Sequence, residues 1–138
     1  MSADYEWQLQ AAFLAVLKAS PALASTPAKP WTQADADAVY PCLVVHCSGV
    51  PELPEGAPLF EAFVELGAKT HTRADPTGQT AAGLLGDIRA AALAPGLAAL
   101  NAQLSGCKVL ATCTGQTSDG VDENIRTRSL TVHCTLQG

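Results

Sequence analysis

An alternation of apolar and mixed side chains between residues 59 and 73 constrains the fold of this chain more than any other feature. The even-numbered positions carry apolar or small side chains, namely Ala62, Val64, Leu66, Ala68 and Thr70. The odd-numbered positions between them carry a mixed set, namely Phe63, Glu65, Gly67, Lys69 and His71. Because successive residues of a strand point to opposite faces of a sheet, this pattern predicts a half-buried strand of an antiparallel sheet.

Three further stretches have the apolar, β-branched composition of strands. Residues 41–48 form one, and residues 107–115 form another with Cys107, Val109, Ala111 and Cys113 predicted on one face. Residues 125–136 place Leu130, Val132, Cys134 and Leu136 on one face, together with Arg126 and Arg128. The intervening stretches 49–58 and 115–124 are predicted to be loops. The last strand carries few charges, so we predict that it is a free edge that pairs with another subunit.

Helical periodicity appears in three places. Residues 3–19 carry an apolar stripe, and Pro21 ends this helix. The pair Asp75-Pro76 is predicted to start a second helix, as its cap and first helical residue, that runs to about residue 94. Its buried stripe is predicted to be Leu84, Leu85, Ile88 and Ala92, with Gly83 and Gly86 allowing close packing on the sheet. A short helix is expected over 97–104.

The predicted element order is therefore helix, strand, strand, helix, strand, strand. This order favours an α+β fold, a mostly antiparallel four-stranded sheet with helices packed on one face. The chain has 138 residues, which fits a single domain over 1–138. A proline-rich connection at about 20–40 is expected to be irregular, with a short helical turn near 32–38.

Charge excludes several classes of function. The chain has 8 basic and 13 acidic residues, a net charge of −5, and its basic residues are scattered. Tight binding to nucleic-acid phosphates is therefore not expected. No apolar run approaches the ~18 residues that a membrane span needs, and the N-terminus lacks the pattern of a signal peptide. Charged residues are 15% of the chain, against about 25% in an average soluble domain, which indicates that part of the surface is covered in an assembly.

The five cysteines and three histidines do not form a recognisable site. An odd number of cysteines without an export signal indicates reduced thiols in a reducing cytoplasm, packed as small apolar side chains. His46 and Cys47 are adjacent, as are His133 and Cys134, but neighbouring strand residues point to opposite faces. No C-x-x-C spacing is present. We therefore expect no catalytic residue, no bound metal and no cofactor.

The layout resembles the tail terminator or tail-completion proteins of long-tailed bacteriophages and related phage-like particles. The similarity covers nearly the whole chain and depends on short motifs in the order of the predicted elements. These motifs are Tyr40-Pro41 before an apolar strand, Asp75-Pro76-Thr77 at a helix start, Leu84-Leu85-Gly86-Asp87-Ile88-Arg89 within the helix, and Arg126-Thr127-Arg128 in the last strand. The proline-rich stretch and the five cysteines depart from the family pattern.

The resemblance implies a virion structural protein of the tail or neck, assembled in the host cytoplasm. Such a protein forms a homo-oligomeric ring, a hexamer in well-known members, that caps the tail tube and stops its growth. Its implied partners are further copies of itself, the tail tube protein and the head–tail connector. DNA would pass through the lumen without specific binding, and neither a membrane nor a cofactor is implied.

Two sets of residues are candidates for these contacts. Glu65, Lys69, Arg126 and Arg128, on outward strand positions, are predicted to contact neighbouring subunits. The loops with Glu52, Glu55, Asp119, Asp122 and Glu123 are predicted to reach axial partners. Two alternatives remain open: a head-completion, connector or other minor tail protein, and a small cytosolic thiol- or metal-dependent enzyme that uses Cys47, His46 and His133.

Overall fold

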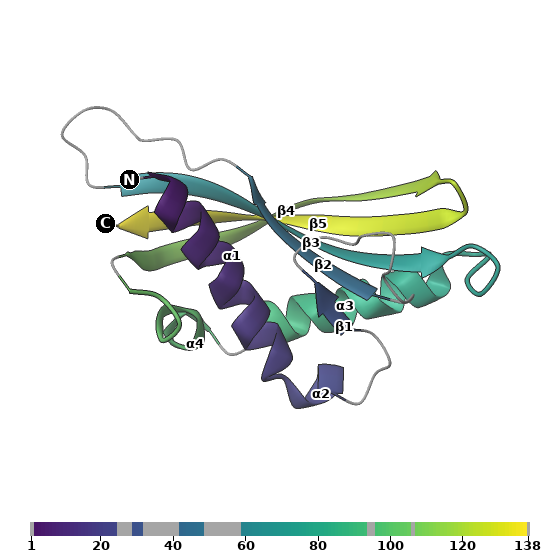
Figure 1. Cartoon of the computed structure of the whole chain (residues 1–138), viewed down its shortest axis with the longest axis horizontal. Helices are drawn as coiled ribbons and strands as arrows, with labels where there is room; N and C mark the ends of the chain where they lie inside the picture. Colours follow the sequence, from purple (N-terminus) through teal and green to yellow (C-terminus); the bar gives the residue numbers. More distant parts are fainter. Residues whose placement is uncertain are drawn as a thin grey trace.

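Helices cover one face of a five-stranded sheet in the computed structural model (Figure 1). The structure describes residues 2–24, 29–31, 42–48, 59–93, 96–105 and 107–137. The helices are α1 (Ser2–Lys18), α2 (Pro21–Ala24), α3 (Gln79–Leu93) and α4 (Leu97–Asn101). The strands are β1 (Lys29–Trp31), β2 (Cys42–Ser48), β3 (Leu59–His71), β4 (Lys108–Asp122) and β5 (Ile125–Gln137). The α+β class with helices on one face is confirmed.

The sheet has one strand more than the sequence predicted. Its order is β1-β2-β3-β5-β4, and every pairing is antiparallel except that of β1 with β2. The additional strand β1 and the short helix α2 both lie in the stretch 20–40 that was expected to be irregular. An element of three or four residues is too short to show a periodicity, so the pattern of side chains could not reveal either. The helical turn predicted near 32–38 lies outside the described residues.

The core lies between the helices and one face of the sheet. The predicted alternation of β3 is confirmed, because Ala62, Val64, Leu66 and Ala68 are fully buried while Phe63 and Glu65 are exposed. The same face of β5 buries Leu130, Val132, Cys134 and Leu136, as the sequence predicted. Leu9, Phe13 and Leu17 of α1 and Leu84 and Ile88 of α3 complete this cluster.

The connection from β3 to α3 depends on one carboxylate. Asp75 is buried, and its side chain accepts hydrogen bonds from the backbone N–H groups of Thr80 and Ala81, both at 3.0 Å, and from the Thr70 hydroxyl at 2.9 Å. The predicted capping role of Asp75 is therefore confirmed. The prediction that Pro76 is the first helical residue is wrong. Gly78 has a φ of +83°, which is incompatible with a helix, so α3 begins only at Gln79.

The region 115–124 is not the loop that its polar composition predicted. β4 continues through it to Asp122, and β5 begins at Ile125. Only Glu123 and Asn124 form the turn, with φ values of +49° and +68°, as a tight two-residue hairpin requires. The prediction that residues 125–136 form a free edge is also wrong, because β5 is paired on both sides and β4 is the edge strand.

Two irregularities in β4 redistribute its side chains between the faces. The pairing with β5 shifts register between Val109 and Ala111 and again between Thr114 and Thr117. The first shift places buried Val109 on the helix side, whereas Ala111 and Cys113 are exposed on the opposite side. The prediction that Cys107, Val109, Ala111 and Cys113 share one face is therefore wrong. Each extra residue in β4 reverses the alternation of its side chains between the two faces of the sheet.

The glycines of α3 do not permit close packing on the sheet, contrary to the prediction. Gly83 and Gly86 are both exposed, and a Cβ atom at either position would meet nothing within 4 Å. The predicted buried stripe of Leu84, Leu85 and Ile88 is confirmed, and it lies on the other side of the helix. Gly83 therefore belongs to the outer surface of the helical layer, and Gly86 lies at the side of α3 that borders the β4–β5 hairpin.

Candidate interaction surfaces

The face of the sheet opposite the helices is not covered by any described element. On β3 it presents Glu61, Phe63, Glu65 and Lys69, and on β5 it presents a row of threonines with His133. The rings of Phe63 and His133 stack with their centroids 4.7 Å apart, and His133 Nε2 lies 3.7 Å from a Glu61 carboxylate oxygen. Lys69 donates a hydrogen bond to the Thr127 hydroxyl at 2.9 Å. This uncovered face mixes an aromatic ring with hydroxyl, acidic and basic side chains, which suits a polar contact with another protein chain.

The structure does not bring the four predicted subunit-contact residues together. Glu65 and Lys69 lie on the uncovered face of the sheet, whereas Arg126 and Arg128 lie on the helix side. Arg126 is not an outward residue, because its side chain is 15% exposed and fixed by two contacts. Its guanidinium lies 3.1 Å from the Asp119 carboxylate and donates to the Pro76 carbonyl at 3.4 Å. Arg126 therefore joins the hairpin to the start of α3.

The predicted axial residues fall into two groups. Asp119, Asp122 and Glu123 lie along and at the tip of the β4–β5 hairpin, and all three are exposed. Asp119 is held by Arg126, while Asp122 and Glu123 have no ion pair with a described residue. Glu52 and Glu55 lie outside the described residues.

The thiols and imidazoles do not form the cluster that an enzyme would need. Cys47 is buried on the helix side, whereas His46 is exposed on the opposite face, as their adjacency in one strand requires. The thiol that faces His133 across the strands belongs to Cys113, which the sequence did not single out. Burial, with a further contribution from Cys47, raises the pKa of Cys134 to about 12, which keeps it protonated and unreactive.

Among the described residues, no three histidine, cysteine or acidic side chains gather closely enough to hold a metal ion. In the part of the chain that the structure describes, no helix has the length and apolar character needed to cross a membrane. All five cysteines are described, and none is in a disulfide. Cys113 is exposed and Cys107 half-buried, so the prediction that every cysteine is buried is wrong for these two.

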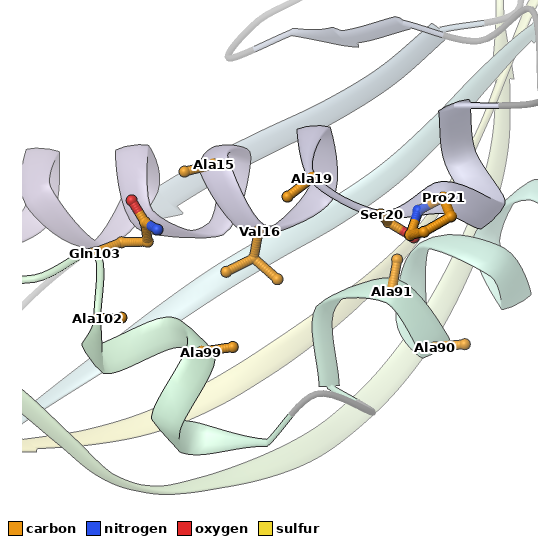
Figure 2. Close-up of a pocket in the computed structure, with 10 residues that line it drawn as sticks. All are labelled: Ala15, Val16, Ala19, Ser20, Pro21, Ala90, Ala91, Ala99, Ala102 and Gln103. Carbon is orange, nitrogen blue, oxygen red and sulfur yellow. The ribbon is translucent and has the colours of Figure 1, made fainter.

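The helical layer contains a groove of about 660 Å³ between α1, α3 and α4 (Figure 2). Alanines from all sides of the groove form most of its wall, and Val16 points into the space between the helices. The alanine residues are Ala15, Ala19, Ala90, Ala91, Ala99 and Ala102. The sequence showed abundant alanine but no signal for a groove, because α1 is distant in the chain from α3 and α4.

The outer edge of β4 has no strand beside it among the described residues. Its central part, from Val109 to Ser118, contains no charged residue and no proline. Leu110 and Cys113 are exposed along it. A long uncharged edge of this kind offers unpaired backbone groups to another chain, although the two register shifts interrupt it.

The fold has a solved counterpart in a phage-like particle. A chain of the structure described as "Virion of native gene transfer agent (GTA) particle" aligns with a TM-score of 0.59 over 94% of this chain and 95% of that chain, at 17% sequence identity. No family model and no curated protein matches the sequence. The similarity extends over nearly the full length of both chains and shows a shared fold.

Proposed function

We propose that this protein is a virion structural protein, and that it acts as a tail terminator. Copies of the chain would form a ring on the last ring of the tail tube, stop tube growth and provide the docking surface for the head connector. The observation that carries this proposal is the full-length structural match to a chain of a gene transfer agent virion. The resemblance of the sequence motifs to tail-completion proteins adds the position within the particle.

The surfaces of the molecule support an assembly role. Among the described residues, an uncovered sheet face, an apolar groove and the uncharged strand edge beyond Val109 have no intramolecular partner. Several large apolar side chains are also exposed, namely Trp7, Phe63, Leu110 and Val121. A chain with this many contact surfaces and few charges is suited to several simultaneous neighbours.

The arrangement favours this function over thiol or metal chemistry. Cys47 and His46 point to opposite faces, and the exposed Cys113 has only the stacked His133 opposite it. A nucleophilic thiol needs an adjacent base and a positively charged surrounding. Among the described residues, no lysine or arginine contacts the Cys113 thiol through a hydrogen bond or an ion pair.

Deletion of the gene tests the proposal, with electron microscopy of the resulting particles as the measurement. A terminator predicts tail tubes of uncontrolled length that fail to join heads. Tails of normal length that stay separate from complete heads would instead support the head-completion or connector role. Intact particles of normal length and composition would contradict both.

A further inference from the structure

A small recess between α3 and the β4–β5 hairpin contains two arginines. It has a volume of about 200 Å³. From α3 it is lined by Ala82, Leu85, Gly86 and Arg89, and from the hairpin by Thr117, Arg128 and Leu130. Because Gly86 has no side chain and a Cβ there would meet nothing within 4 Å, the helix leaves the recess open to solvent.

Neither guanidinium has an anionic partner among the described residues. Arg89 is exposed and Arg128 half-buried, and neither makes a hydrogen bond or an ion pair with a described residue. Asp119 is directly opposite Arg128 in the strand register, but its carboxylate pairs with Arg126 instead. Two like charges that line one small recess repel each other, and a bound anion relieves this repulsion.

We propose that this recess binds a carboxylate of a second copy of this chain, held by Arg89 and Arg128. Planar guanidinium groups match the geometry of a carboxylate, and the Thr117 hydroxyl can donate a further hydrogen bond. A volume of about 200 Å³ admits a single side-chain head group. A DNA backbone is disfavoured, because Asp119, Asp122 and Glu123 lie on the neighbouring hairpin and the described residues continue no row of cations from the recess.

The hairpin tip of the second copy supplies the carboxylate. Asp122 and Glu123 are exposed at a narrow two-residue turn, whereas Glu65 lies within a strand on the uncovered face of the sheet. The hairpin tip cannot reach the recess of its own chain. Asp122 is five residues beyond Thr117, which places it about 17 Å farther along the strand. The contact therefore joins two different patches of identical chains, and such head-to-tail contacts form a ring where the rotation between neighbouring subunits closes. This inference rests on the proposed function, since it names a contact between neighbouring subunits of the ring.

Charge reversal in the full-length chain tests the contact, with sedimentation velocity as the measurement. Arg128→Glu alone and Glu123→Arg alone are each expected to raise the dissociation constant of self-association by about tenfold or more. An equal mixture of the two variants is expected to associate again when the variants alternate. Half of the contacts then join the native Arg128 to the native Glu123, and the other half join the two reversed charges. Arg73→Glu is the matched control, since Arg73 is exposed outside the recess and its reversal leaves association unchanged.

A pair of glycine variants separates the recess from general effects on α3. Gly86→Gln places a side chain in the recess and is expected to weaken association. Gly83→Gln changes the same helix outside the recess and is expected to leave association unchanged.

Three results would overturn the inference. The first is a dissociation constant of self-association that neither charge reversal changes. The second is a native chain that stays monomeric at every concentration tested. The third is binding of inorganic phosphate or duplex DNA that Arg128→Glu abolishes while self-association persists. The deletion experiment on particles tests the terminator function separately. Tail tubes of uncontrolled length after deletion, together with self-association that the charge reversals leave unchanged, would identify a terminator that uses another subunit contact.

Discussion

The side-chain amide of Asn101 pairs with the backbone of Val109 through two hydrogen bonds. Its oxygen accepts from the Val109 N–H at 2.7 Å, and its nitrogen donates to the Val109 carbonyl at 3.0 Å. The Asn101 side chain thus makes the two hydrogen bonds to Val109 that a neighbouring strand would make, and it attaches α4 to the start of β4. It also protects the beginning of an edge that is otherwise unpaired among the described residues.

Replacing Asn101 by alanine is expected to lower the free energy of unfolding by about 1–3 kcal/mol, because it leaves the N–H and carbonyl of Val109 unsatisfied. Urea denaturation followed by circular dichroism measures this change. The control is Gln103→Ala, since Gln103 is exposed and close in sequence. Equal stability of the two variants would show that the amide pair contributes nothing.

Asp75 is expected to make the stability of the fold depend on acid pH. Burial opposes its ionisation, but the Thr80 and Ala81 amides, the Thr70 hydroxyl and the nearby Arg126 outweigh burial and hold its pKa below the ordinary value. A lowered pKa in the folded state gives stability that is present above about pH 4, the pKa in the unfolded chain, and is lost as pH falls through the folded value.

Asp75→Asn is expected to remove this pH-dependent part and to cost about 1–3 kcal/mol near neutral pH. Denaturation curves at several pH values between neutral and strongly acidic conditions measure both effects. A variant that retains the acid dependence of the native protein would assign that dependence to other carboxylates.

The cysteines are expected to react at very different rates. Cys113 is exposed, whereas Cys42, Cys47 and Cys134 are buried, and burial raises the pKa of Cys42 and Cys134. Brief treatment of the folded monomeric chain with iodoacetamide should therefore modify Cys113 first, as measured by peptide mass spectrometry. The buried three should react only after denaturant is added. Early modification of Cys134 would contradict the packing described above.

Two glycines are expected to respond in opposite ways to alanine. Gly83→Ala should raise the free energy of unfolding by about 0.5–1 kcal/mol, because alanine favours a helix and its Cβ meets nothing within 4 Å. Gly115→Ala should lower it, because its Cβ would lie 3.0 Å from the Thr131 carbonyl oxygen. Thermal denaturation of the two variants checks both signs.

Features set by local periodicity could be predicted from the sequence. The buried faces of β3 and β5 follow from alternation, and the buried side of α3 follows from its Leu84, Leu85 and Ile88 stripe. The order of the strands could not be predicted, because it depends on pairings between residues distant in the chain. For the same reason the polar residues 115–124 resembled a loop, although pairing with β5 holds nearly all of them in a strand.

The candidate surfaces were predictable only in part. The sequence indicated Arg128 and the acidic residues 122 and 123 as contact residues. It could not indicate Arg89, which lines the same recess as Arg128 only because α3 packs beside the hairpin. The role of Arg126 was also hidden, since its partner Asp119 lies diagonally across the hairpin from it only when the hairpin continues beyond residue 115.

Locating the chain in purified particles by cryo-electron microscopy tests the central claim most directly. We expect a closed ring of identical copies at the head-proximal end of the tail tube, each copy with the five-stranded sheet and helices of this fold. Particles that contain no copy of the chain, or contain it only away from the tail and neck, would contradict it.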